Sequence, residues 1–359
     1  MRSLVINSGS SSIKLSLFED DRLVSHTLKE EVSDLAAVLE ELLSTIKTSS
    51  LDFVAHRVVH GGSRFSKPTR IDTGNIEALK ALHFLAPLHN PYNVAAIEYF
   101  LQYHPSIPQV AVFDTAFHAT MPKEAYMYAI EPKFLEVSHI RRYGFHGSSH
   151  SYLLKRAAAM LGKSTEETSL ITLHLGNGAS ACAIQNGKSI DTSMGFTPLE
   201  GLVMGSRSGD IDPGVVLFMQ RELGMGVDEV DAELNHRSGL KALCGTNDMR
   251  EILNRKDEEA QTALAIYTRR IKKYIGAYMA LLERVDAIVF SGGVGEHAVK
   301  VREMVLQGLE KFGILPDFAA NARGDAIISQ KKSPINVFVI ATDEEREIME
   351  SAKEVIADE

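Results

Sequence analysis

The chain has 359 residues, which predicts two domains, and its 38 lysines and arginines against 47 aspartates and glutamates give a formal net charge of −9. This acidic balance argues against nucleic acid as a partner, and 45% hydrophobic residues argue against disorder. Two cysteines exclude a disulfide framework, and the lack of a signal peptide and of an apolar run of about 18 residues predicts a soluble cytoplasmic protein without a membrane partner.

The first predicted elements are two short strands joined by a loop of small residues. Residues 4–6 form an apolar run, residues 7–12 form the loop, and apolar and polar residues alternate from 13 to 17. Serine and glycine expose backbone N–H groups at a tight turn, and Lys14 adds a positive charge, so this loop suits a phosphate. A surface hairpin is the alternative. The loop is not a P-loop, because G-x-x-x-x-G-K-[ST] is absent.

Two charged residues stand in apolar surroundings in the first third of the chain. Arg57 lies in an apolar run, where burial of an arginine is costly unless it meets an anion. Asp114 ends the apolar run 110–113, where α/β proteins place functional groups. An aspartate at this point also suits a helix N-cap, and the local sequence does not separate the two interpretations.

Helices are expected in several places. Asn90 followed by Pro91 predicts a helix with Asn90 as its N-cap that ends near Tyr103. A second helix is expected over 149–161, with Gly162 as its stop. A third shows helical spacing of large apolar residues along one face, at Leu264, Tyr267, Ile271, Tyr274, Tyr278 and Leu281.

Two pairs of histidines are spaced four residues apart, as zinc ligands on a helix often are. His56 and His60 lie in a strand-like run, where residues four apart do not share a metal. His146 and His150 lack the glutamate of the H-E-x-x-H motif, and no third ligand is evident. We therefore interpret His146 as a hydrogen-bond donor near a developing negative charge rather than as a zinc ligand.

The strand–loop–strand pattern of the N-terminus returns about 170 residues later. Residues 170–175 form a strand-like run, residues 176–180 a loop of small residues, and residues 186–187 a hairpin turn after a second strand. Asn177 occupies the place that Asn7 has in the first copy. This repeat predicts a duplicated fold in which each half contributes one loop to a shared cleft.

A single basic residue lies in a long glycine-rich stretch. Arg207 is the only lysine or arginine between 191 and 214, a pattern that suits binding of phosphate or carboxylate. An internal salt bridge to Glu200, Asp210 or Asp212 explains the local sequence equally well.

Two further loops follow apolar runs near the C-terminus. Residues 287–290 lead into 293–298, which match G-x-G-x-x-A, and a helical stretch is expected from there to about 312. The match is too short and too late in the chain for a dinucleotide fingerprint, but glycines at a helix start suit contact with a nucleotide. Further on, Thr342 and Glu345 fit a capping box, so a helix is expected there.

Strands and helices alternate in both halves, which favours an α/β class. Taken together, the motifs resemble those of the acetate kinases, in the acetate and propionate kinase family of the sugar kinase, Hsp70 and actin superfamily. The matching segments run in family order over almost the whole chain, at residues 5–14, 56–62, 86–91, 112–118, 144–150, 174–180, 191–214, 248–250, 292–296 and 341–345.

The resemblance implies a two-domain actin-like and ribonuclease-H-like duplicated fold with an active-site cleft between the domains. It places the first domain at 1–116 plus 343–359, with the C-terminal helix packed back on it, and the nucleotide-binding domain at 117–342. It also implies a homodimer.

The resemblance implies roles for individual residues. Arg207 and His146 would stabilise the transition state, and Arg57 would hold the carboxylate. The full set comprises catalytic residues Asp114, His146 and Arg207; acid-binding residues Arg57, Val59, Leu88, Phe145 and Pro198; ATP-binding residues Lys14, His174, Leu175, Gly176, Asn177, Gly178, Asp248, Met249, Arg250, Gly293, Val294, Gly295, Glu296 and His297; and metal ligands Asn7 and Glu344.

The implied reaction is reversible in-line transfer of a phosphoryl group from ATP to acetate, giving ADP and acetyl phosphate, with Mg²⁺ or alternatively Mn²⁺. Three alternatives remain at this point. The acid is propionate or butyrate, the donor is pyrophosphate, or the chain is a non-catalytic ATP-binding protein of the actin type. Two departures from the family pattern stand out, a shorter segment between Lys14 and Arg57, and His297 in place of the usual asparagine.

Overall fold

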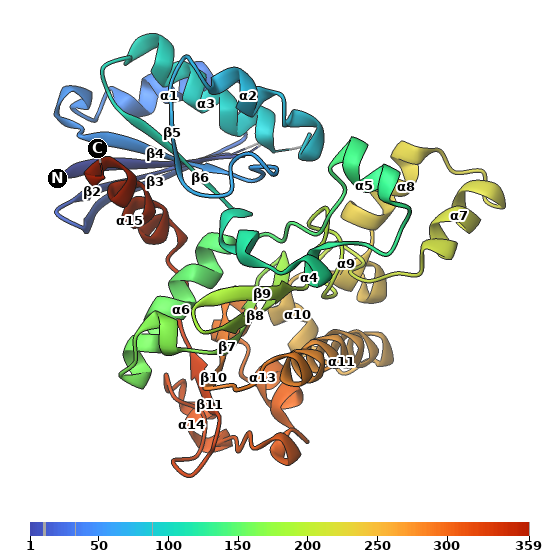
Figure 1. The fold of residues 1–359 in the computed structure, drawn as a ribbon. Coiled ribbons are helices and arrows are strands. Elements are labelled where there is room, and N and C mark those ends of the chain that lie inside the picture. Colours follow the sequence, from blue (N-terminus) through green and yellow to red (C-terminus); the bar gives the residue numbers. More distant parts are fainter. Residues whose placement is uncertain (10–11, 33, 88, 359) are drawn as a thin grey trace. The chain divides into compact units, whose positions relative to one another are not determined.

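The computed structural model describes residues 1–9, 12–32, 34–87 and 89–358, and shows a mixed α/β protein (Figure 1). The chain divides into two compact units. Unit 1 comprises Met1–Ala119, Gly147–Ser149 and Asp343–Glu359, and unit 2 comprises Thr120–His146 and His150–Thr342. Each unit is built around one β-sheet with helices on both faces.

The sheet of unit 1 has the strand order β3-β2-β1-β4-β6-β5, in which β1, β4 and β6 run parallel. Strands β1, β2 and β3 form an antiparallel meander, and β5 is antiparallel to β6. The elements are β1 (Arg2–Ser8), β2 (Ser12–Glu19), β3 (Arg22–Glu30), α1 (Leu35–Leu43), β4 (Phe53–Val58), β5 (Thr69–Ile71), α2 (Ile76–Lys80), α3 (Asn90–Tyr103), β6 (Gln109–Phe113) and α15 (Glu344–Ala357), with short 3₁₀ turns at Thr48–Ser50, His83–Leu85 and Ala116–Thr120.

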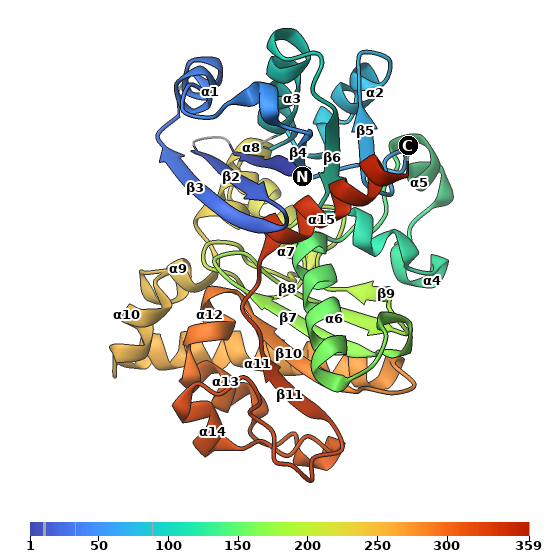
Figure 2. The same ribbon diagram turned by 90° about the vertical axis from the view of Figure 1, so that its left-hand side faces the viewer.

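Alternation along β1 assigns its side chains to two hydrophobic layers, because successive residues of a strand point to opposite faces. Leu4 and Ile6 pack in the layer beneath α1 and α3, whereas Val5 packs in the layer beneath α15. Figure 2 shows α15 on one face of this sheet and α1 and α3 on the other. The C-terminal helix therefore completes the core of the unit that the N-terminus begins.

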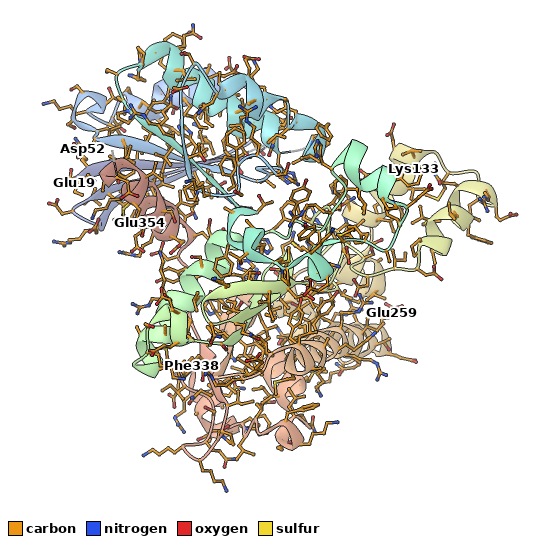
Figure 3. The ribbon with its side chains drawn as sticks, in the orientation of Figure 1. Glu19, Asp52, Lys133, Glu259, Phe338 and Glu354 are labelled. Carbon is orange, nitrogen blue, oxygen red and sulfur yellow. The ribbon has the colours of Figure 1, made fainter. Side chains whose placement is uncertain are left out.

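The sheet of unit 2 has the order β11-β10-β7-β8-β9, with α6 and α11 on opposite faces (Figures 1 and 2). Phe338 of β11 is buried among the packed side chains of this unit (Figure 3). The elements are α4 (Lys123–Tyr126), α5 (Pro132–Ser138), α6 (Gly147–Leu161), β7 (Leu170–Leu175), β8 (Ala179–Gln185), β9 (Lys188–Thr192), α7 (Pro213–Arg221), α8 (Val227–His236), α9 (Gly239–Cys244), α10 (Met249–Asn254), α11 (Glu258–Leu281), β10 (Ala287–Ser291), α12 (Gly292–His297), α13 (Val299–Leu306), α14 (Phe318–Arg323) and β11 (Asn336–Val339), with 3₁₀ turns at Thr165–Glu167 and Glu310–Phe312.

The predicted duplication is confirmed by the two strand orders. The series β3-β2-β1-β4-β6 in unit 1 and β9-β8-β7-β10-β11 in unit 2 have the same sequence of antiparallel and parallel pairings. Asn7 pairs with Lys14 across the first hairpin, and His174 pairs with Ser180 across its counterpart. Asn7 and His174 each lie one residue before the end of their strand, so the residue equivalent to Asn7 is His174 and not the predicted Asn177.

Two predicted helix caps are wrong, although both helices form. His89, not Asn90, is the N-cap of α3, because the Asn90 amide instead accepts from the His60 N–H at 3.0 Å and donates to the His60 carbonyl at 2.9 Å. Asp343, not Thr342, caps α15, and its carboxylate accepts from the Arg346 N–H at 3.1 Å. In α3, the backbone of His60 binds the Asn90 side chain that would otherwise cap the helix.

Three further local predictions concern turns and helix ends. Helix α6 ends at Gly162, whose φ of 65° is left-handed, as predicted. Asn186 and Gly187 both have positive φ and join β8 to β9 as a two-residue turn. The helix expected from 293 to 312 is instead broken at Ala298 into α12 and α13. Within the described ranges, no helix has the length and apolarity needed to span a membrane.

Candidate active site

Unit 1 carries a cluster of charged side chains at the carboxyl ends of its parallel strands. Arg57 is on β4, and Asp114 directly follows β6, its neighbour in the sheet. The guanidinium donates through Nε to Asp114 Oδ1 at 2.9 Å and through Nη2 to Oδ2 at 2.7 Å, a bidentate pair. Asp114 is 2% exposed, and both of its oxygens accept from Arg57. The anion that Arg57 meets in this unit is therefore Asp114, whereas a helix-capping role of Asp114 stays a prediction.

The remaining groups around Arg57 are oxygen donors. Its Nη1 lies 3.5 Å from Asn7 Oδ1, and its Nη2 lies 3.8 Å from Glu344 Oε2. Burial opposes the charge of Arg57, but the carboxylates of Asp114, Glu344 and Glu345 outweigh burial and raise its pKa above the ordinary value. Nearby, Lys14 forms an ion pair with Glu345 in the first turn of α15. The cluster thus pairs two cations with three carboxylates.

The donors of this cluster fit a hard divalent cation better than zinc. Asn7, Asp114 and Glu344 offer amide and carboxylate oxygens, the ligands that Mg²⁺ prefers. In the part of the chain that the structure describes, no three His, Cys, Asp or Glu side chains gather as a self-sufficient metal site. A cation that takes one or two protein carboxylates and completes its shell with phosphate and water suits such a set.

Two buried asparagines that sequence analysis did not select as site residues hold the loops of this cluster. Asn93, on α3, accepts from the Val59 N–H at 3.1 Å and donates to the Ser8 carbonyl, so it ties the end of β1 to the end of β4. Asn90, one turn earlier, holds His60. Both are on the helix face that also buries Val94 and Ile97. A polar residue at helical spacing on an apolar face was the signal that could have identified them.

Unit 2 holds a cluster of histidines around one serine hydroxyl. His146 Nδ1 and His150 Nε2 lie 2.9 and 2.8 Å from Ser180 Oγ. His150 Nδ1 lies 2.7 Å from Thr172 Oγ1, so both ring nitrogens of this buried histidine have hydroxyl partners. The ring of His174 lies 4.3 Å from that of His146, centroid to centroid. The pair His146 and His150 is thus a hydrogen-bonded assembly rather than a zinc site.

Arg207 approaches the same place as His146. A Cβ built on Gly178 would lie 3.5 Å from His146 Nε2 and 3.6 Å from Arg207 Nη1. The Arg207 guanidinium donates to the Pro198 carbonyl at 3.2 Å. Burial lowers the pKa of Arg207, and no carboxylate of the described residues acts against that effect. The Arg207 guanidinium and the His146 imidazole thus both lie close to Gly178, which has no side chain to fill the space beside them.

The alternative interpretation of Arg207 as an internal salt bridge is wrong for the described residues. Glu200 accepts from Tyr128 at 2.6 Å and pairs with Arg142 at 2.5 Å. Asp210 pairs with Arg270 at 3.3 Å, and Asp212 caps α7. Each of the three carboxylates that could have neutralised Arg207 thus has another partner. A half-buried guanidinium without a carboxylate partner in the described part of the chain is the feature expected of an anion-binding site.

A cavity of about 360 Å³ lies within unit 2, beside the loop that joins β7 to β8. Eight of the predicted ATP-binding residues line it, together with apolar side chains from α9 and α10 that sequence analysis missed. The predicted residues are Gly176, Asn177, Asp248, Met249, Arg250, Gly293, Val294 and His297; the others are Gly205, Leu240, Asn247, Leu253 and Ala298. Glycine on two walls and apolar side chains on a third suit a nucleotide.

Several predicted ATP-binding residues of unit 2 do not line this cavity. The Glu296 carboxylate turns to the backbone, where it accepts from the N–H groups of Gly292 at 2.9 Å and Thr342 at 3.2 Å. Leu175 is fully buried, and Gly295 packs against Leu175 and Phe290. His174 and Gly178 face the histidine cluster.

The predicted pocket for the methyl group of the acid is only partly described. Phe145 is buried in unit 2, and Pro198 in the same unit accepts a hydrogen bond from Arg207. Val59 is half-buried at the end of β4 in unit 1. Leu88 lies outside the described residues.

Solved structures define the class of protein to which this fold and these loops belong. An acetate kinase from Porphyromonas gingivalis is 37% identical, with a TM-score of 0.93 and 99% of both chains covered. A propionate kinase from Francisella tularensis is 39% identical, with a TM-score of 0.92 over 98% of this chain and 99% of that one. The two sheets are thus those of a duplicated actin-like and ribonuclease-H-like kinase fold.

Sequence comparison narrows this class to one family. The model of the acetokinase family matches residues 20–350. An acetate kinase of Sulfurimonas denitrificans is 49% identical over 387 residues, covering 99% of this chain and 100% of that relative, and one of Helicobacter pylori is 46% identical over 396 residues, covering 99% of each. The chain belongs to the acetokinase family.

Proposed function

We propose that the protein catalyses reversible transfer of the γ-phosphoryl group of ATP to acetate, giving ADP and acetyl phosphate. The observation that carries this proposal is the half-buried Arg207 guanidinium, which approaches Gly178 together with His146 and has no carboxylate partner among the described residues. The neighbouring residues Gly176, Asn177 and Gly205 line a nucleotide-sized cavity. The names of the relatives support acetate as the acceptor.

In this reaction, a carboxylate oxygen of acetate forms a bond to the γ-phosphorus. The bond from that phosphorus to the β–γ bridging oxygen breaks, and ADP leaves with the electron pair. Phosphoryl transfer depends mainly on positioning and on neutralising charge at the transferring group. We assign that neutralisation to Arg207, and hydrogen-bond donation to His146, whose Nδ1 is held by Ser180 so that Nε2 faces Gly178.

Acetate needs no general base, because a carboxylic acid with a pKa of about 4 is already ionised at neutral pH. Asp114 therefore has a positioning task in our proposal. Both of its oxygens accept from Arg57, which orients the guanidinium and keeps the carboxylate in place. In the working enzyme, Arg57 would hold the carboxylate of the acid, and Lys14 would contact phosphate.

We propose Mg²⁺ as the metal, with Mn²⁺ as an alternative, held by Asn7 and Glu344 with Asp114 nearby. When bound, the ion would supply positive charge to the phosphate oxygens. The amide and carboxylate oxygens around Arg57 support a hard cation.

For the acid, Val59, Leu88, Phe145 and Pro198 are proposed as the apolar pocket. One methylene changes discrimination only about 10–200-fold, so propionate is a second candidate substrate, favoured by the propionate kinase among the similar structures. We also propose that the protein acts as a cytoplasmic homodimer on small molecules, with its domains divided at 1–116 plus 343–359 and 117–342.

The test is trapping of acyl phosphate with hydroxylamine. The protein would receive Mg-ATP with acetate, propionate, butyrate or no acid. Product that is greatest with acetate supports the proposal, and product that is greatest with propionate moves the assignment to that acid. No product with any acid, from protein that binds ADP in a calorimeter, would contradict the kinase function. Pyrophosphate would then be the next donor to try.

A further inference from the structure

A buried arginine holds one wall of the nucleotide cavity from behind. Arg302, on α13, is 1% exposed. Its Nη1 donates to the carbonyl oxygens of Gly295 and Glu296, both at 2.8 Å. These carbonyls are at the end of α12, the helix that supplies three of the residues lining the cavity.

A second buried side chain fixes the other edge of this guanidinium. Arg302 Nε donates to Asn321 Oδ1 at 2.6 Å, and Asn321 Nδ2 donates to the Val299 carbonyl at 3.1 Å. Asn321 is fully buried, on α14. A planar guanidinium has donors in a fixed fork, so these partners determine both its place and its orientation. Two helices behind the cavity are thereby joined to the end of α12.

The positive charge of Arg302 is balanced by dipoles rather than by an ion pair. Among the described residues, no carboxylate lies within salt-bridge distance of it, and burial lowers its pKa against only the charge of Glu303. Burying a cation is expensive, and a neutral side chain of similar size often serves stability as well or better. Stability alone therefore does not explain an arginine here, whereas precise placement of two carbonyls does.

We propose that Arg302 is a positioning residue that sets nucleotide affinity by fixing α12 against the cavity, without touching the nucleotide. The inference rests on the proposed function of this cavity as the ATP site. Gly293 and Val294 present backbone and a small apolar surface to the cavity. Such contacts require the backbone to be placed to within about 0.5 Å.

Two variants of Arg302 distinguish the loss of its hydrogen-bond geometry from the loss of its positive charge. Arg302→Lys keeps the cation, but a single ammonium does not reach both carbonyls and Asn321 in the fork geometry. Arg302→Met removes the donors and leaves three acceptors without them. We expect KM for ATP and Kd for ADP to rise about tenfold in the methionine variant and less in the lysine variant, while kcat and KM for acetate stay within about twofold.

Arg142→Met is the matched control. Arg142 is 17% exposed, forms an ion pair with Glu200 and donates to three carbonyls, at 3.1 Å to Thr192, 3.3 Å to Ser193 and 3.0 Å to Met194, none of which lines the cavity. We expect this variant to unfold at lower temperature and to keep the ADP affinity of the wild type. Simple destabilisation would therefore not imitate the effect of changing Arg302.

The Arg302 variants and the wild type together test the positioning role of Arg302 separately from the proposed kinase function. Unchanged ADP affinity in Arg302→Lys and Arg302→Met, or an equal change of KM for acetate and for ATP, would overturn the positioning role. If the methionine variant does not fold, the lysine variant alone decides. A wild-type protein that forms acyl phosphate and binds ADP keeps the proposed function whatever these variants show, whereas a wild type that does neither removes it.

Discussion

Arg207 and His146 face the same small volume, since a methyl group on Gly178 would lie 3.6 Å from Arg207 Nη1 and 3.5 Å from His146 Nε2. These are ordinary van der Waals separations, so the fold has room for an alanine there. The methyl group would, however, fill the space between the two groups assigned to the transferring phosphoryl group.

We therefore predict that Gly178→Ala lowers kcat at least about tenfold, because a displacement of about 1 Å in a reacting geometry has costs of that order. The unfolding temperature should stay close to that of the wild type. Steady-state kinetics together with a thermal melt check both halves. A normal kcat would show that this volume is not used in the reaction.

The two arginines assigned to anions should respond in different ways to removal of their charge. Asp114 is buried and bonded to Arg57 through both oxygens, so Arg57→Met leaves a buried carboxylate without its cation. Such a loss costs about 3 kcal/mol of unfolding free energy. Arg207→Met removes a half-buried cation that has no carboxylate partner among the described residues, so that free energy should stay nearly unchanged.

Urea unfolding of the two variants and the wild type measures this contrast directly, with activity followed in parallel. We expect both variants to lose most of their kcat. Equal destabilisation by the two substitutions would mean that Arg207 has a stabilising partner in the folded protein and is not held ready for a ligand.

Asp114→Asn tests whether this carboxylate acts through the metal. The amide keeps the shape and one acceptor oxygen but loses the negative charge that would attract a cation or its water ligands. We expect activity to fall and to recover in part as Mg²⁺ is raised. Activity lost at every Mg²⁺ concentration would assign Asp114 a role in the chemistry itself, beyond metal positioning.

Two buried histidines of unit 1 make stability depend on pH. Burial lowers the pKa of His56 to about 3 and that of His60 to about 4, both below the ordinary value of 6.5. The unfolded chain therefore binds protons that the folded chain excludes, so stability falls as the pH decreases from 6.5 towards 4 for His60 and towards 3 for His56.

We predict that His56→Gln flattens this dependence. The unfolding free energy of the wild type should drop more between pH 7 and pH 5 than that of the variant, by roughly 2 kcal/mol, since one proton contributes about 1.4 kcal/mol per pH unit below 6.5. Urea unfolding at the two pH values provides the numbers. Parallel losses in both proteins would show that His56 takes up its proton in the folded state.

The sequence predicted the repeated strand–loop–strand units because apolar runs and small-residue turns are local signals. The same holds for Gly162 and for the turn at Asn186 and Gly187, where one or two residues determine the backbone. The parallel pairing of β4 with β1 and of β10 with β7 was not predicted, and the return of α15 to unit 1 came only from the resemblance.

Long-range competition explains what local patterns did not predict. Asn90 has the right place for a helix cap, but its amide binds His60, thirty residues earlier. Glu296 lies in the loop that resembles a nucleotide contact, yet its carboxylate binds two backbone N–H groups, one of them at Thr342. Nothing around Arg302 in the sequence distinguishes it from a surface arginine.

The proposed mechanism depends most on Arg207 as the group that stabilises the transferring phosphoryl group rather than the bound nucleotide. The most direct measurement compares acyl phosphate formation from acetate and Mg-ATP by the wild type and by Arg207→Met, with Kd for ADP measured on both. We predict that the wild type forms product, and that the variant binds ADP with unchanged Kd while kcat falls at least about 100-fold. A variant with near-normal kcat would contradict the account.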